Sequence, residues 1–255
     1  MKVYELHRKT PNNIGDYWCN PSRYFNFENL CSQELMHSDS LTPGDALIIG
    51  GGGLIHKKFQ KHINRILDKN PKVSALWGIG HNFGKKHIQK TKISPYYPKW
   101  IYQANLIGIR DWIDGYQSMY LPCVTCMHSA FDKSYEVKHD AVFYTHAFKS
   151  KYQTSQDNIH MSNDERDFDA VISFLGSANT VITDSYHGAY WAQLLGKDVR
   201  VVSWSVKFDH MKYPPSFLEH ITKWHHAKPI LPPAEYLDES RELNTQFYQK
   251  FLNLL

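Results

Sequence analysis

The chain has 255 residues, enough to bury a sizeable core and to form two compact α/β halves. Its 42% hydrophobic and 21% charged residues are ordinary for a globular protein and exclude a disordered one. The formal net charge of +4 suits anionic substrates or the inner face of a membrane, but is too small to indicate nucleic-acid binding. Because we find neither a run of roughly 20 apolar residues nor a signal-peptide pattern, we expect a cytoplasmic protein, with at most a peripheral contact with the inner membrane.

Strands that alternate with helical stretches predict parallel sheets with crossover helices. In the first half we expect strands at residues 3–7, 46–49, 73–77 and 106–109, and a helix over residues 54–68. In the second half we expect strands at residues 141–144, 180–183 and 199–203, and helices at residues 167–176, 188–195 and 239–254.

The charged, aperiodic stretch at residues 129–140 predicts a linker between two domains. We therefore expect one domain at residues 1–128 and a second at residues 141–238. The last helix, within residues 239–255, is expected to pack back on the first domain.

Four cysteines are present, and two of them, Cys123 and Cys126, stand close to His128. This spacing is one half of a zinc site, but a second ligand pair at usable spacing is missing. We therefore expect reduced thiols and no bound metal.

The polar motifs of the chain follow predicted strands. In parallel α/β sheets ligands bind at the carboxyl ends of the strands, so these motifs are expected to converge. The glycines at residues 50–53 allow a backbone to approach a ligand closely ahead of a helix, or simply form a tight turn. They lack the spacing of a dinucleotide fingerprint, because Ile55 stands where the third glycine belongs.

His187 follows an apolar strand and is expected to open a helix, where an imidazole beside a helix N-terminus suits proton transfer to a bound anion. A capping role without chemistry is the alternative. Arg110 ends another strand beside Asp111, and either clamps a carboxylate or phosphate or forms a structural ion pair. Asn13 and Asp16 either bind a sugar or form an Asx turn.

Taken together, these motifs resemble the polysaccharide pyruvyltransferase family. The matching segments are Asn13-Ile14-Gly15-Asp16, Gly50-Gly51-Gly52-Gly53-Leu54, Gly78-Ile79-Gly80, Arg110-Asp111, Thr183-Asp184-Ser185-Tyr186-His187-Gly188-Ala189 and Gly196-Lys197. They occur in the order found in the family. The resemblance implies a GT-B-like fold of two Rossmann-type domains with parallel sheets facing a central cleft.

The resemblance also implies transfer of an enolpyruvate-derived group from phosphoenolpyruvate to a sugar, forming a cyclic ketal on a surface-polysaccharide precursor. The sugar acceptor would be lipid-linked or nucleotide-linked, and no cofactor is implied. Catalysis would use His187 as acid/base and Arg110 as anion clamp. The remaining site residues would be Asn13, Gly15, Asp16, Gly51, Gly52, Gly80, His81, Asp184, Ser185, Tyr186, Gly188 and Lys207.

One position departs from the family pattern. Many members carry arginine where this chain has Ser185, so one expected partner of the anionic donor is absent. Arg110 or Lys207 is then the cation that replaces it.

Two other functions stay open. One is a glycosyltransferase of the same architecture that places the diphosphate of a nucleotide sugar at the helix over residues 188–195. The other is a glycan-binding subunit without catalysis.

Overall fold

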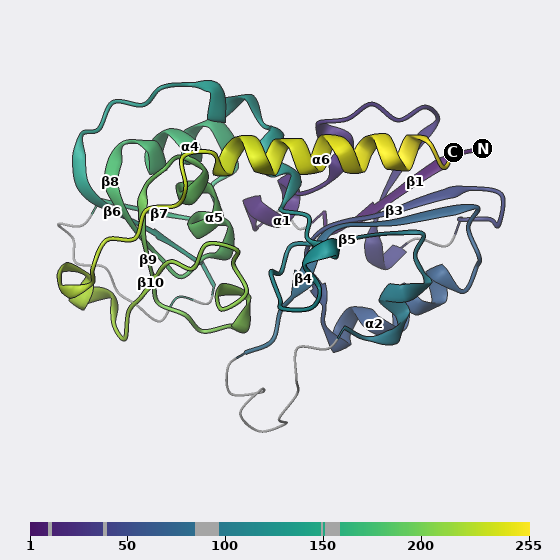
Figure 1. The fold of residues 1–255 in the computed structure, drawn as a ribbon, viewed down its shortest axis with the longest axis horizontal. Helices are drawn as coiled ribbons and strands as arrows, with labels where there is room; N and C mark the ends of the chain where they lie inside the picture. The colour runs from purple at the N-terminus through teal and green to yellow at the C-terminus, as the bar shows by residue number, and fades with distance from the viewer. Residues whose placement is uncertain (10–11, 38–39, 85–96, 149, 151–158) are drawn as a thin grey trace. The chain divides into compact units, whose positions relative to one another are not determined.

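The computed structural model describes residues 1–9, 12–37, 40–84, 97–148, 150 and 159–255. It contains two five-stranded parallel sheets in two compact units (Figure 1). Unit 1 comprises Met1–Thr10, Asp16–Thr125 and Ser240–Leu255, and unit 2 comprises Pro11–Gly15 and Cys126–Glu239. The predicted α/β class with two parallel sheets is confirmed.

The sheet of unit 1 has the strand order β2-β1-β3-β4-β5 (Figure 1). Its strands are β1 (Val3–His7), β2 (Leu30–Glu34), β3 (Ala46–Ile55), β4 (Val73–His81) and β5 (Leu106–Ile109). The helices that contribute to this unit are α1 (Ile14–Trp18), α2 (Lys57–Leu67) and α6 (Tyr236–Leu252). This order is that of a doubly wound sheet, in which the connections leave in opposite directions on either side of β1 and β3.

Helix α2 packs on this sheet through one face. Its buried residues Phe59, Ile63 and Ile66 recur at the three- to four-residue spacing of a helix stripe. They join a core with apolar side chains of the central strands, among them Leu47 and Leu76.

The expected turn at residues 50–53 is wrong, because all four glycines lie inside β3. Gly51 and Gly52 have positive φ values of 56° and 85°, which glycine adopts without strain, so the strand continues through an irregular register with β4. The helix that follows begins at Lys57, after the N-cap His56. The glycines therefore do not expose backbone N–H groups at a helix N-terminus.

Unit 2 repeats the strand order of unit 1, with β10-β9-β8-β6-β7. Its strands are β6 (His139–Thr145), β7 (His160–Ser162), β8 (Ala178–Thr183), β9 (Asp198–Val201) and β10 (Ser216–Phe217). Its helices are α4 (Phe168–Gly176), capped by the Asp167 side chain, and α5 (Tyr186–Leu194), whose nine residues are all buried.

Short 3₁₀ helices complete the described chain. They are η1 (Pro21–Arg23), η2 (Leu35–His37), η3 (Lys99–Gln103), η4 (Gln117–Met119), η5 (Val124–Met127), η6 (Ser129–Asp132), η7 (Val206–Phe208) and η8 (Ile221–His226). The stretch expected as a linker, residues 129–140, contains η6 and the start of β6 and belongs to unit 2, because the contacts divide the chain between Thr125 and Cys126. Among the described residues, no helix has the length and apolar character that crossing a bilayer requires.

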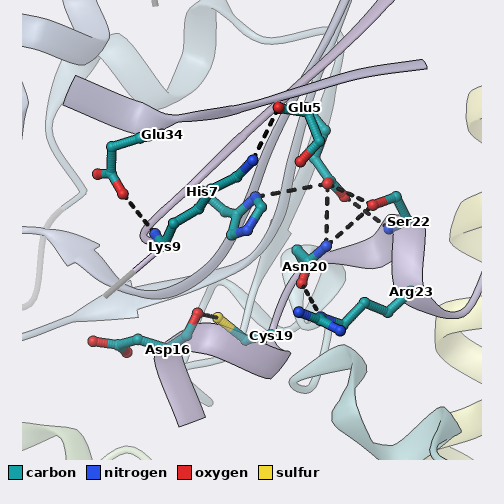
Figure 2. A network of polar contacts seen from close by, with 10 residues as sticks. Glu5, His7, Lys9, Asp16, Cys19, Asn20, Ser22, Arg23 and Glu34 are labelled. Atoms are coloured by element: carbon teal, nitrogen blue, oxygen red, sulfur yellow. Dashed lines mark hydrogen bonds and ion pairs between the residues drawn. The ribbon is translucent and has the colours of Figure 1, made fainter. Parts of the chain in front are cut away.

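A buried carboxylate fastens the segment after α1 to the first strand (Figure 2). Glu5, in the middle of β1, is 0% exposed and accepts hydrogen bonds from the N–H of Ser22 (2.7 Å), from Ser22 Oγ (2.6 Å) and from Asn20 Nδ2 (3.2 Å). His7 Nδ1 lies 3.6 Å from the same carboxylate. Burial lowers the pKa of His7, partly offset by the charge of Glu5, so the imidazole is neutral near pH 7.

The part of α6 that belongs to unit 1 is anchored by Asn244, which is 0% exposed. Its Oδ1 accepts from Trp77 Nε1 at 2.8 Å, and its Nδ2 donates to the carbonyls of Pro122 and Ser240. Trp77, on β4, is also fully buried, so no water can take the place of the Asn244 amide as the partner of the indole N–H.

We expect Asn244→Ala to destabilise the protein by about 1–3 kcal/mol, because it leaves a buried indole N–H and a buried carbonyl without their partner. The measurement is urea unfolding followed by tryptophan fluorescence and by far-UV circular dichroism. The control is Gln246→Ala on the exposed face of the same helix, expected to stay within about 0.5 kcal/mol of wild type. Equal midpoints for the two variants would contradict the anchoring role.

Candidate functional site

At the carboxyl edge of the unit 2 sheet, a hydrogen bond links the ends of two neighbouring strands. His146 directly follows β6, and Asp184 directly follows β8. The backbone N–H of His146 donates to Asp184 Oδ1 over 2.7 Å. These strands flank the point where the connections of this sheet diverge, which is where doubly wound sheets bind ligands.

Asp184 is a deeply buried carboxyl at this edge, 1% exposed. Burial raises its pKa, against the opposing hydrogen bonds of His146 and Ser150 and the charge of Lys207. Asp184 therefore keeps its proton to a higher pH than an exposed aspartate does. Its carbonyl accepts from Trp204 Nε1 at 2.8 Å, so the residue is held at both ends.

His187 lies inside the first turn of α5 rather than ahead of the helix. The expected start at Gly188 is wrong, because Ser185 is the N-cap and its Oγ accepts the N–H of Gly188 at 3.4 Å. The imidazole is 6% exposed and stacks on Trp191, one turn later, at 5.3 Å and 28°. The positive end of the α5 dipole is therefore next to a fixed imidazole.

The N-terminal loop passes directly against this ring. A Cβ at Gly15 would lie 1.9 Å from His187 Nδ1, so only glycine fits there. Asn13 Oδ1 accepts the N–H of Gly15 at 3.1 Å, which is the expected Asx turn. The N–H of Ile14 donates to the carbonyl of Asn163 at 3.0 Å and holds the loop on unit 2.

Lys207 supplies a cation at the same edge. It lies on η7, is 8% exposed, and its Nζ is 4.3 Å from the centre of the Trp204 ring. Its charge acts on Asp184, whose pKa it lowers against the effect of burial. Ser185 is the N-cap of α5, so its hydroxyl is engaged with the helix backbone.

In unit 1, a polar pair is formed by His81, the last residue of β4, and Asp111, just after β5. Asp111 Oδ2 accepts the backbone N–H of His81 at 2.7 Å and lies 2.6 Å from His81 Nδ1. Arg110 is 3% exposed. A Cβ at Gly80 would lie 2.6 Å from Asp111 Oδ1 and 2.7 Å from Arg110 Cγ, so this glycine makes room for both side chains.

Asp16 and the glycines Gly51 and Gly52 of β3 lie around a buried cysteine. A Cβ at Gly51 would lie 2.3 Å from Cys19 Sγ, and one at Gly52 would lie 3.2 Å from Asp16 Oδ1. The Cys19 thiol is 1% exposed and donates to the carbonyl of Asp16. Burial, followed by the nearby Cys123 and Asp16, raises its pKa well above the usual range, which makes it a poor nucleophile.

The described residues contain no group of three or more His, Cys, Asp or Glu side chains placed to hold a metal ion. Cys123 and Cys126 are both 0% exposed, and Cys123 Sγ accepts from Thr125 Oγ1 at 3.3 Å. A polar cavity of about 370 Å³ lies at the opposite, amino edge of the unit 1 sheet. Its lining includes Lys72, Gln103 and Asn105 and none of the predicted site residues.

The predicted site residues divide between the units. Unit 2 carries Asn13, Gly15, Asp184, Ser185, Tyr186, His187, Gly188 and Lys207. Unit 1 carries Asp16, Gly51, Gly52, Gly80, His81 and Arg110. Arg110 and His187 thus belong to different units. Sequence reasoning missed His146 and Trp204, although the strand-end rule that selected Asp184 also applies to His146 after β6.

No family model and no curated protein matches this sequence. Among solved structures, the chain is similar to the crystal structure of a functional uncharacterized protein from Klebsiella pneumoniae subsp. pneumoniae NTUH-K2044. The TM-score is 0.49 at 15% sequence identity, over 85% of this chain and 92% of that chain. A likeness at this level carries no argument about function.

We expect Gly15→Ala to displace the His187 ring, because the added methyl group would overlap Nδ1. The ¹⁵N resonances of the His187 ring should shift, and any activity that depends on this imidazole should fall with it. The control is Gly44→Ala, where an added Cβ meets no atom within 4 Å. A Gly15→Ala protein with unchanged His187 resonances would show that the loop around residue 15 moves and the ring does not.

Asp184→Asn should gain stability relative to wild type as the pH rises. The pKa of Asp184 is raised in the folded state, so the wild type loses stability from its unfolded pKa of about 3.9 upwards, until the folded pKa is passed. The asparagine Oδ1 can still accept from His146, while no charge is buried. Melting temperatures between pH 4 and pH 8 test this, with Asp140→Asn as the exposed control. A difference that does not change with pH would contradict it.

Proposed function

We propose that this chain is a pyruvyltransferase, which moves an enolpyruvate-derived group from phosphoenolpyruvate to a sugar of a surface-polysaccharide precursor. The observation that carries the proposal is the edge of unit 2, where the N-terminus of α5, His187 and Lys207 lie around the strand ends of β6 and β8. A helix N-terminus and a lysine suit a phosphate and a carboxylate, the two anionic groups of phosphoenolpyruvate.

The reaction needs a proton donor beside the anion site. One proton goes to the methylene carbon, two sugar hydroxyl oxygens bond to the central carbon, and the carbon–oxygen bond to phosphate breaks. The two hydroxyl protons balance the proton added to carbon and the one that leaves with phosphate. We assign the first transfer to His187, whose ring is fixed by Trp191 and by the close approach of Gly15.

We also propose the GT-B-like arrangement that the family resemblance implies, with two Rossmann-type units facing a central cleft. In that arrangement Arg110 would clamp the anionic donor from unit 1. A transferase that uses a nucleotide sugar would present a diphosphate to the same helix end, so the experiment must separate the two donors.

The deciding experiment is mass spectrometry of lipid-linked and nucleotide-linked sugars incubated with the protein and phosphoenolpyruvate. We expect a product heavier by one pyruvic acid less one water, and phosphoenolpyruvate should raise the melting temperature. Stabilisation by a nucleotide sugar, with glycosyl transfer, would replace the proposal by the glycosyltransferase function. Sugar binding without turnover under any donor would indicate a glycan-binding subunit.

His187→Ala should lower kcat by roughly 10²- to 10⁴-fold, the usual contribution of general acid–base catalysis. His187→Gln should be nearly as damaging, because glutamine can keep a hydrogen bond but cannot transfer a proton. Arg110→Ala should instead mainly raise KM for phosphoenolpyruvate. The control is His226→Ala, an exposed histidine of the same unit. A folded His187→Ala protein with wild-type turnover would exclude the catalytic role.

A further inference from the structure

The pair formed by His81 and Asp111 has the geometry of an oriented base. One carboxylate oxygen, Asp111 Oδ2, lies 2.6 Å from His81 Nδ1 and 2.7 Å from the backbone nitrogen of the same residue. Because a carboxylate only accepts, Nδ1 carries the proton, and Nε2 is the ring atom with a lone pair. Two contacts from one oxygen fix both the position and the tautomer of the ring.

The surroundings keep the carboxylate charged. Burial alone would raise the pKa of Asp111, which is 2% exposed, but the hydrogen bonds of His81 and the charge of Arg110 outweigh burial and lower it. An ionised aspartate stabilises the imidazolium that forms when histidine takes up a proton. The pair can therefore accept a proton without moving any of its atoms far.

Aromatic rings border the imidazole. Tyr97 stacks on His81 with ring centres 5.2 Å apart and an angle of 21°, and Phe83 follows at 5.8 Å and 45°. Tyr97 is buried and Phe83 is half-buried. Aromatic faces beside a hydrogen-bond acceptor are a common lining for the apolar faces and hydroxyl groups of a sugar.

We propose that His81, oriented by Asp111, is a proton acceptor for a hydroxyl group of a sugar bound at the carboxyl edge of β4 and β5. In the step, the O–H bond of the sugar breaks, the proton passes to His81 Nε2, and the electron pair stays on oxygen as the nucleophile. The proton later leaves the imidazolium to water. This inference rests on the proposed function insofar as the hydroxyl is that of the sugar acceptor.

The first test does not need pyruvyl transfer. The full chain, with ¹⁵N-labelled histidine, is titrated with methyl glycosides of galactose, glucose and mannose, and His81 is assigned by His81→Gln. We expect the Nδ1–H tautomer in the wild type, a mixture of tautomers in Asp111→Asn, and a glycoside-dependent shift of the Nε2 resonance. Asp114→Asn, an exposed acid three residues away, should leave the tautomer unchanged. An Nε2–H tautomer, or an Nε2 resonance that responds to none of the glycosides, would overturn the proposal.

The second test uses turnover with phosphoenolpyruvate. His81→Gln and Asp111→Asn should lower kcat by roughly 10²- to 10⁴-fold while leaving the thermal shift caused by phosphoenolpyruvate unchanged. The acidic limb of the pH profile should disappear in His81→Gln. Within the described part of the chain, the charged or titratable groups beside this ring are Asp111, Arg110 and Tyr97. Retention of that limb with wild-type turnover would refute the role of His81. A wild-type protein that pyruvylates no sugar refutes the proposed function instead, and the NMR test still decides on His81.

Discussion

An aspartate carboxylate that accepts the backbone N–H of a histidine on the neighbouring strand closes the carboxyl edge of both sheets. In unit 2 the pair is Asp184 and His146, in unit 1 it is Asp111 and His81, and each hydrogen bond measures 2.7 Å. Where parallel strands end, their N–H groups lose the ladder partner, and a buried one left unpaired costs about 1–3 kcal/mol. The same constraint therefore places a carboxyl group and a histidine at the carboxyl edge of each unit.

The pKa values of the two aspartates shift in opposite directions, because their surroundings differ. Asp111 also binds the ring of its histidine and lies near Arg110, which lowers its pKa, whereas His146 Nδ1 accepts from the N–H of Phe148, and burial raises the pKa of Asp184. Unit 1 thus presents an ionised, base-orienting carboxylate, which suits hydroxyl groups. Unit 2 presents a carboxyl that resists ionisation beside Lys207 and a helix N-terminus, which suits an anion.

Much of the fold could be predicted from apolar runs: strands β1 and β5, for example, have the predicted bounds. The strands β2, β7 and β10 were missed, because their residues carry too little apolar pattern to distinguish them from loops. The glycines of β3 were placed in a turn, because nothing local reveals that a strand with positive φ values continues through pairing with β4. The partnership of His81 and Asp111 joins residues 30 positions apart, so it depends on strand order rather than on a local motif.

The two sheets have the same strand order, but their titratable pairs lie at the ends of different strands. In unit 2 the strands that flank the switch point, β6 and β8, end in His146 and Asp184. In unit 1 the corresponding strands are β1 and β3, and packing fills this position: Cys19 lies on Gly51, and Glu5 is enclosed by Asn20 and Ser22 (Figure 2). The titratable pair of unit 1 lies instead at the ends of β4 and β5, where Gly80 leaves room for Arg110 and Asp111.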